Sequence, residues 1–191
     1  MVERFLLHFF AMTLHTYTRA TWTTPEACAI DKDVASTDYV SAGVVTAPTY
    51  LKWALVFEEP ENKTVWVGKA LPRSFLEQGA GTVQIRGATT RYGRLDATIE
   101  ASAPGAAFSV NASLALPPAF AAASLQPPGG LRLRFRAPFD SAGLPRRMTA
   151  VTVGGAAWPA FDAGAETVDF AAAELTPALL ARLASGVVAS Y

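Results

Sequence analysis

Leu131-Arg132-Leu133-Arg134-Phe135-Arg136-Ala137 is the stretch that indicates the fold most clearly, because polar and apolar residues alternate along it without interruption. Three arginines fall on one face of an extended chain, and two leucines and a phenylalanine fall on the other. Successive side chains of a strand point to opposite faces of a sheet, so this period of two predicts a strand with one wet and one buried face.

The same alternation recurs elsewhere between residues 61 and 191. Arg94–Ala101 and Phe108–Leu114 show it clearly. Shorter candidate strands are Val65–Val67, Thr82–Arg86, Thr149–Val153 and Thr167–Phe170. Several short strands separated by turns rich in proline and glycine favour an antiparallel β-sandwich over residues 61–191.

Local signals predict two more elements in this part of the chain. Gly154-Gly155 suits a two-residue hairpin turn, because glycine tolerates positive φ. Thr176 as N-cap, Pro177 in the first turn and Gly186 as a stop signal predict a helix over Ala178–Ser185. The sandwich is therefore expected to end in a short C-terminal helix.

The first 60 residues lack the period of two. Val2–Ala20 is apolar nearly all round as a helix, and so is a second predicted helix over Ala47–Glu59, which begins with Pro48 in its first turn. Helices of this kind are buried on most of their circumference. We therefore expect residues 1–60 to be the helical tail of a larger, truncated domain, and the fold class to be α+β, mainly β.

Composition excludes several function classes. The 191 residues carry 16 basic and 16 acidic side chains, so we expect no nucleic-acid partner, because such partners select a basic surface. No stretch approaches the roughly 20 apolar residues that a membrane span needs. A secretory signal in the first residues is disfavoured, because His8 interrupts the apolar run and Glu3 cancels the charge of Arg4. No localisation is predicted.

Cofactor motifs are missing as well. The chain has no Walker loop, no dinucleotide-binding fingerprint and no His-Glu-x-x-His sequence. His8 and His15 are the only histidines, and a metal site would need further ligands. We expect neither a cofactor nor a bound metal.

The most informative polar stretch is Arg19–Asp33. It combines Trp22 with the carboxylates of Glu26, Asp31 and Asp33. An aromatic face packs on the apolar face of a sugar ring, and carboxylates accept hydrogen bonds from hydroxyls and catalyse glycoside hydrolysis. This mixture predicts a carbohydrate site with Glu26 as the catalytic candidate. The alternative is that Glu26 only contributes to a helix cap and that the two aspartates are solvated.

The order of these segments resembles the C-terminal end of large six-hairpin glycosidase-like proteins, in which an (α/α)6 barrel is followed by a β-sandwich. The segments that carry the resemblance are Arg19–Glu26, Tyr39–Pro48, Leu51–Glu58, Val65–Arg73, Thr90–Arg94, Leu131–Arg134 and Val151–Gly155 with Trp158 and Phe161. The resemblance implies that residues 1–60 are two buried helices from the end of such a barrel.

It also implies a glycoside hydrolase-like, carbohydrate-active protein that acts on a carbohydrate substrate. With two helices instead of about twelve, this chain would keep only the last loop at the barrel mouth, so we expect it to be inactive alone. Glu26 would be the retained catalytic carboxylate, and Trp22, Asp31 and Asp33 would contact substrate.

Two other functions stay open. The strands could form a non-catalytic carbohydrate-binding sandwich, with the helices packed across one face. The chain could instead be a structural interaction domain that offers its apolar helices and open sheet edges to a partner.

Overall fold

The computed structural model describes residue 4, residues 6–10 and residues 41–191 of the chain. The chain divides into two units, Met1–Ala54 and Leu55–Tyr191. The first contains most of the helix α2 (Ser41–Leu55), and the second contains every strand among the described residues. The described part is mainly β with few helices, as expected from the alternating sequence.

The helical N-terminal region is confirmed where it is described. Residues 4 and 6–10 are helical, and α2 covers the second predicted helix. The bounds of the second helix were predicted wrongly, however. α2 begins six residues earlier than expected, at Ser41, so Pro48 lies inside it, where proline contributes no N–H donor to the helix. It also ends at Leu55 instead of Glu59.

Apolar side chains of α2 are exposed, although the sequence predicts buried helices. The exposed fractions are 58% for Val45, 44% for Leu51 and 46% for Trp53. Tyr50 is 41% exposed, and its ring contacts the Trp53 ring at a tilt of 48° with 5.8 Å between ring centroids. Only Ala54 is buried among the described side chains of α2.

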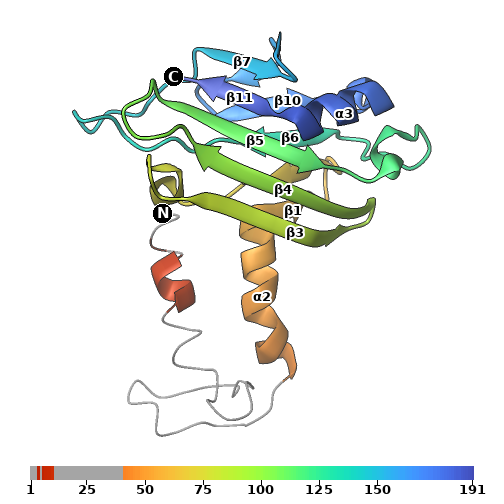
Figure 1. Cartoon of the computed structure of the whole chain (residues 1–191). Coiled ribbons are helices and arrows are strands. Elements are labelled where there is room, and N and C mark those ends of the chain that lie inside the picture. The colour runs from red at the N-terminus through yellow and green to blue at the C-terminus, as the bar shows by residue number, and fades with distance from the viewer. Residues whose placement is uncertain (1–3, 5, 11–40) are drawn as a thin grey trace, which may run out of the picture. The chain divides into compact units, whose positions relative to one another are not determined.

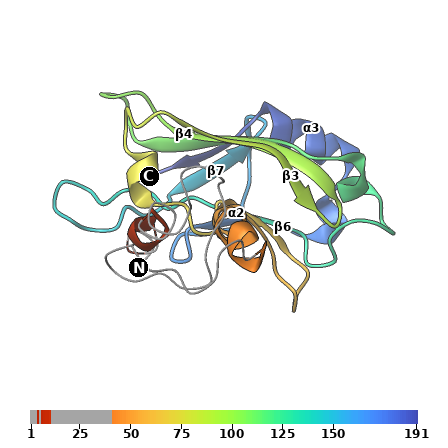
Figure 2. The ribbon, with the colours of Figure 1, turned by 90° about the horizontal axis from the view of Figure 1, so that it is seen from below.

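The strands form two sheets, which lie in separate layers in Figures 1 and 2, with β3, β4 and β5 in one layer and β6 in the other. The five-stranded sheet has the order β1 (Val56–Glu58), β2 (Val65–Val67), β6 (Leu131–Arg134), β10 (Thr167–Phe170) and β9 (Phe161–Asp162). The six-stranded sheet has the order β3 (Thr82–Thr90), β4 (Gly93–Ala101), β5 (Ser109–Ala115), β11 (Val187–Ser190), β7 (Ala150–Val153) and β8 (Ala156–Ala157).

The pairing is antiparallel as predicted, with one difference. β2 and β6 run parallel, with Val65 opposite Leu131 and Val67 opposite Leu133. The chain between these strands contains the whole of β3, β4 and β5, and a connection of that length permits a parallel pair.

Among the described residues, one hydrophobic core receives side chains from both sheets. The five-stranded sheet contributes residues such as Leu131, Leu133 and Phe170, and the six-stranded sheet contributes residues such as Ile99 and Leu114. In β4 and β5 these residues alternate with exposed or half-buried polar ones. The period of two in the sequence therefore identifies the buried faces correctly.

The short helices surround this core. They are the 3-10 helices η1 (Arg73–Leu76), η2 (Pro118–Ala121) and η3 (Ala172–Glu174), together with α3 (Pro177–Ser185). α3 confirms the predicted helix: the Thr176 side chain accepts a hydrogen bond from the Leu179 N–H at 3.2 Å, and Gly186 ends the helix at φ 135°. Leu179 and Leu183 of α3 are buried in the core.

Three strands were missed in the sequence, β1, β9 and β11. β1 continues directly from α2, and β11 follows α3, so the chain ends in a strand and not in the predicted helix. β11 lies between β5 and β7, pairing Val187 with both Ala112 and Val153. All three strands are short, and their neighbours in the sheets determine their conformation.

Candidate functional site

The four residues predicted from the sequence as a carbohydrate site lie outside the described residues. They are Glu26, Trp22, Asp31 and Asp33. The surfaces of the two sheets are therefore the parts of the chain in which a site can be built from geometry.

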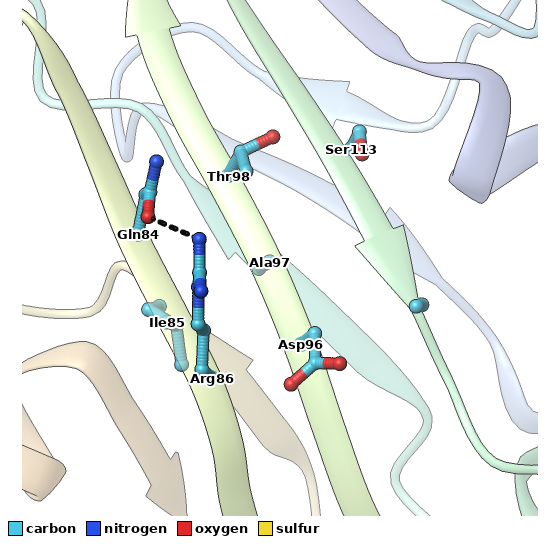
Figure 3. Close-up of a pocket in the computed structure, with 8 residues that line it drawn as sticks. Gln84, Ile85, Arg86, Asp96, Ala97, Thr98 and Ser113 are labelled. Atoms are coloured by element: carbon cyan, nitrogen blue, oxygen red, sulfur yellow. Dashed lines mark hydrogen bonds between the residues drawn. The ribbon is translucent and has the colours of Figure 1, made fainter.

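The outer face of the six-stranded sheet carries a polar depression of about 370 Å³. Figure 3 shows Gln84 and Arg86 on β3, Asp96 and Thr98 on β4, and Ser113 on β5 along this depression. The register places Gln84 opposite Thr98 and Thr98 opposite Ser113, so these three side chains form one row across three strands. The row exists because polar residues occupy alternate positions in each strand.

A β-bulge shapes one end of the depression. The register of β3 against β4 shifts between Ile85 and Ala88, and Gly87 adopts φ 60° at this point. The freed Gly87 N–H donates to Oδ1 of Asp96 at 2.5 Å. Bulges re-aim side chains and occur often beside binding sites. Here the bulge fixes the Asp96 carboxylate at the surface of the sheet.

Gln84 and Arg86 are also held together, and Arg86 itself lies in the bulge. Nη2 of Arg86 donates to Oε1 of Gln84 at 2.9 Å, which leaves the Gln84 amide nitrogen as a donor toward solvent. In the described part of the chain, the hydroxyls of Thr98 and Ser113 have no hydrogen-bond partner. The depression thus combines donors, an acceptor and two hydroxyls.

The outer face of the five-stranded sheet is different, because its aromatic rings are already covered. Nζ of Lys69 lies 3.7 Å from the ring centroid of Phe57 and 5.0 Å from that of Trp66. The guanidinium of Arg132 lies 4.7 Å from the Trp66 ring, whose Nε1 donates to Glu59 at 3.2 Å. Cations stack favourably on aromatic faces. This row is therefore a packed cation–π cluster and not an open aromatic platform.

Burial beside these rings lowers the pKa of Lys69. The carboxylate of Glu59 opposes that shift, and the neighbouring Arg134 adds to it. The ammonium group is thus held against the rings at an electrostatic cost.

The three arginines of the alternating stretch are bound to the chain. Arg132 forms an ion pair with Asp169 on the neighbouring strand β10. Nη1 of Arg134 donates to the Lys69 carbonyl at 3.4 Å, and Nη1 of Arg136 donates to the Leu71 carbonyl at 3.0 Å. The wet face predicted for these residues is half-buried and internally paired, so they do not form an open row for anions.

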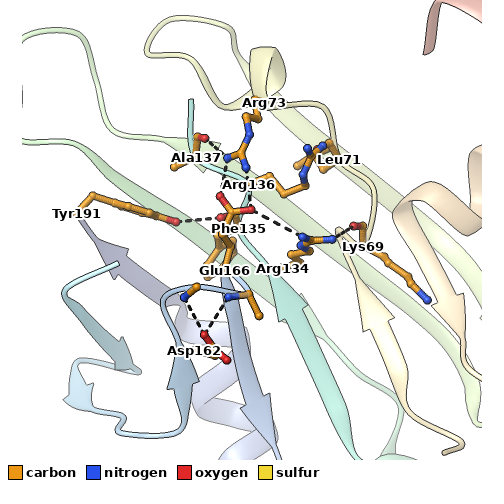
Figure 4. Close-up of polar contacts among 12 residues, drawn as sticks. Lys69, Leu71, Arg73, Arg134, Phe135, Arg136, Ala137, Asp162, Glu166 and Tyr191 are labelled. Carbon is orange, nitrogen blue, oxygen red and sulfur yellow. Dashed lines mark hydrogen bonds and ion pairs between the residues drawn. The ribbon is translucent and has the colours of Figure 1, made fainter. Parts of the chain in front are cut away.

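A second polar network lies around Glu166, directly before the first residue of β10 (Figure 4). The guanidinium of Arg73 donates to both carboxylate oxygens of Glu166, at 2.5 and 3.0 Å, and also to the Ala137 carbonyl at 2.5 Å. The hydroxyl of Tyr191 donates to the Phe135 carbonyl at 3.1 Å. Burial raises the pKa of Tyr191, the nearby Glu166 carboxylate raises it further, and Arg73 lowers it. These groups join distant segments and leave no open acid or base.

A membrane-spanning helix and a metal-ligand cluster are both missing from the segments that the structure describes. In those segments, no helix has the length and hydropathy needed to cross a bilayer. The same segments bring together no group of three His, Cys, Asp or Glu side chains suited to a metal ion.

The polar depression was missed in the sequence because its lining residues come from three strands. The most distant of them, Gln84 on β3 and Ala115 on β5, are 31 residues apart in the sequence. One local signal was present. Gly87 interrupts a run of strand-forming residues, and an isolated glycine in a strand indicates a bulge or a close approach.

Known proteins provide no further guide to this site. Neither models of protein families, nor curated proteins, nor solved structures match the chain.

Proposed function

We propose that this chain is the C-terminal part of a carbohydrate-active, glycoside hydrolase-like protein of the six-hairpin type. In this proposal α2 and the helix before it are the last helices of an (α/α)6 barrel, and the two sheets form the β-sandwich that follows. The chain alone lacks most of the barrel and is inactive as an enzyme.

The observation that carries the proposal is the apolar surface of α2. Val45, Tyr50, Leu51 and Trp53 are all more than 40% exposed, and β1 follows α2 without an intervening residue. A helix with apolar residues on several sides is normally buried in a larger helical assembly. Further helices of a barrel would cover these side chains.

The arrangement of the sheets supports the sandwich. Apolar residues of both sheets belong to one buried cluster, while the opposite positions of β4 and β5 carry polar side chains. Sheets that share one core in this way are typical of β-sandwiches.

The carbohydrate assignment rests on the resemblance and on the polar loop. In the proposal Glu26 is the retained catalytic carboxylate, and Trp22, Asp31 and Asp33 contact sugar. The exposed amide, hydroxyl and carboxylate groups on the six-stranded sheet are also groups that hydrogen-bond polyhydroxylated ligands.

A glycan array tests the substrate class. The purified chain is compared with Trp22→Ala and Glu26→Ala, and with Glu61→Ala as a control at an exposed carboxylate. We expect glycan binding that is weakened about tenfold or more in Trp22→Ala, because removal of a stacked aromatic ring costs more than about 1 kcal/mol. Glu61→Ala should bind like the parent chain. Binding that is equal in all four proteins contradicts the loop site.

Dye binding tests the barrel origin independently of any sugar. An exposed apolar helix face should bind a hydrophobic dye, and Leu51→Gln together with Trp53→Gln should reduce the dye fluorescence. Leu125→Gln is the matched control, because Leu125 is an exposed leucine outside α2, with an exposed fraction of 60%. Fluorescence that is absent from the parent chain, or unchanged by the α2 variants, contradicts the proposal.

A further inference from the structure

The polar depression on β3, β4 and β5 has hydrogen-bonding capacity that the chain does not use. Oδ1 of Asp96 is occupied by the Gly87 N–H, so Oδ2 remains available as an acceptor. Oε1 of Gln84 is occupied by Arg86, so the Gln84 amide nitrogen remains available as a donor. The hydroxyls of Thr98 and Ser113 can each donate and accept a hydrogen bond.

This set of groups suits neighbouring hydroxyls of one ligand. Each hydroxyl of a sugar is both a donor and an acceptor, and the depression offers both kinds of partner along one row. Gln84, at one end of the row, is held by Arg86, and Asp96, which lies beside the row two residues from Thr98 on β4, is held by the bulge. Side chains held by the backbone or by a neighbour lose less conformational entropy on binding.

The charge in the depression favours a neutral ligand. Arg86 and Asp96 carry opposite charges, and the other lining side chains are uncharged. A polyanion would be attracted by the Arg86 guanidinium and repelled by the Asp96 carboxylate, so its net electrostatic attraction to the depression would be small.

The open shape of the depression favours an internal stretch of a polysaccharide as the ligand. The volume of about 370 Å³ lies within the range of small-ligand pockets, about 300–1,000 Å³. Gln84, Arg86, Asp96 and Thr98 are all exposed, so the depression is open along the sheet and does not enclose a ligand. A polysaccharide can enter such a depression from either side.

We infer that the outer face of the six-stranded sheet is a second glycan-binding site, separate from the Trp22 loop, and that it binds a neutral polysaccharide through Gln84, Asp96, Thr98 and Ser113. The ligand class rests on the proposed function, and the position rests on the geometry of the sheet. The site anchors the protein to polymeric substrate and takes no part in bond cleavage.

Affinity gel electrophoresis tests this site with three neutral polysaccharides, xyloglucan, galactomannan and mixed-linkage β-glucan, and with polygalacturonate as an acidic counterpart. The variants are Asp96→Asn and Thr98→Val on the sheet and Trp22→Ala in the loop. Asp96→Asn keeps an oxygen for the Gly87 N–H and converts the second oxygen into a donor. Thr98→Val removes only the hydroxyl and keeps a β-branched side chain, which strands favour. Glu61→Gln is the matched control.

We expect at least one neutral polysaccharide to retard the parent chain, and each sheet variant to raise its dissociation constant about fivefold to tenfold, because each removes one hydrogen bond to the ligand. Glu61→Gln should behave like the parent. Thermal unfolding of each protein establishes that the variants are folded. Because Thr98 is exposed and its hydroxyl makes no hydrogen bond in the described part of the chain, Thr98→Val remains informative if Asp96→Asn unfolds the bulge.

The outcomes separate this inference from the proposed function. Loss of binding in Asp96→Asn and Thr98→Val but not in Trp22→Ala supports the sheet site and contradicts the loop site. Loss in Trp22→Ala alone overturns the sheet site and leaves the proposed function standing. Preference for polygalacturonate, or no retardation by any neutral polysaccharide, also overturns the sheet site, while dye binding to α2 still decides the barrel origin.

Discussion

Arg73 and Glu166 are 93 residues apart in the sequence and form a two-pronged ion pair, in which Nη1 of Arg73 donates to Oε1 of Glu166 and Nη2 donates to Oε2. The side chain of Glu166 is 9% exposed and that of Arg73 is 18% exposed. Glu166 also adopts φ 61°, a backbone conformation that non-glycine residues rarely occupy. The pair therefore holds the turn before β10 against η1 in spite of that strain.

Breaking this pair should destabilise the fold. Glu166→Ala leaves the guanidinium of Arg73 half-buried without its carboxylate, and such losses cost about 3 kcal/mol. Arg73→Ala should cost a similar amount, and the double variant should cost clearly less than the sum of the two. Urea unfolding of the four proteins measures these free energies.

The exposed pair of Arg91 and Glu58 is the control for this cycle. Its atoms are 4.0 Å apart, and the Arg91 side chain is 70% exposed. The coupling between these two side chains should not exceed about 0.5 kcal/mol. Equal coupling energies in the two cycles would show that Arg73 and Glu166 act as an ordinary surface pair.

Tyr191 should make the fold sensitive to alkaline pH. Its pKa in the folded chain is raised above the unfolded value of 10.0, so the folded state keeps the phenolic proton longer than the unfolded state. The contribution of the neutral hydroxyl is therefore complete below about pH 10 and is lost progressively as the pH rises above it.

Tyr191→Phe isolates this effect. At pH 8 the variant should be less stable by about 1 kcal/mol, because the Phe135 carbonyl loses the hydrogen bond from Tyr191 and keeps only the one from the Ala137 N–H. Between pH 9 and about pH 11.5 the parent should lose stability faster than the variant, so that the difference shrinks. Parallel pH profiles of the two unfolding free energies would contradict this role of Tyr191.

Gly130 should tolerate no side chain. Its φ is 76°, and a Cβ atom placed there would lie 2.2 Å from the Phe170 carbonyl oxygen. Gly130→Ala should cost about 2–3 kcal/mol or more, because strain and overlap act together. Gly155→Asn is the control, since Gly155 has φ 79° with open space around it, and asparagine accepts this conformation. A change within about 0.5 kcal/mol is expected for it. Equal losses in both variants would contradict the close approach.

The N-cap of α3 gives a smaller effect. Thr176→Ala removes the acceptor of the Leu179 N–H and should cost about 1 kcal/mol. Thr176→Ser keeps the oxygen and should be close to neutral. Thermal unfolding measures both, and a loss in the serine variant as large as that in the alanine variant would show that the cap bond is unimportant.

Strands with one polar and one apolar face were predictable from the sequence, and so were their buried residues. β2 and β10 coincide with the predicted ranges, and the Gly154-Gly155 hairpin is confirmed by positive φ at both glycines. In these cases the period, the turn residues and the cap residues are all local. The tertiary structure did not need to be known.

Other elements depend on partners that are distant in the chain. Val56–Glu58 continues an apolar helical pattern and becomes β1 because it pairs with β2. Val187–Ser190 is too short for a period to be recognised and becomes β11 between two strands. The polar depression has the same origin, since the register of three strands and the bulge at Gly87 bring its side chains together.

The most direct test of the central claim, that this is a carbohydrate-active chain, is an NMR titration of the ¹⁵N-labelled protein with the polysaccharide-derived oligosaccharide that binds most tightly. If the chain binds carbohydrate at the loop and on the six-stranded sheet, we expect shifts in the amide signals around Trp22 and Glu26 and in those of Gly87, Thr98 and Ser113. Signals of Trp66 and Arg132 on the other sheet should remain in place. An absence of shifts at a saturating concentration, or shifts confined to Trp66 and Arg132, would contradict carbohydrate binding at these two sites.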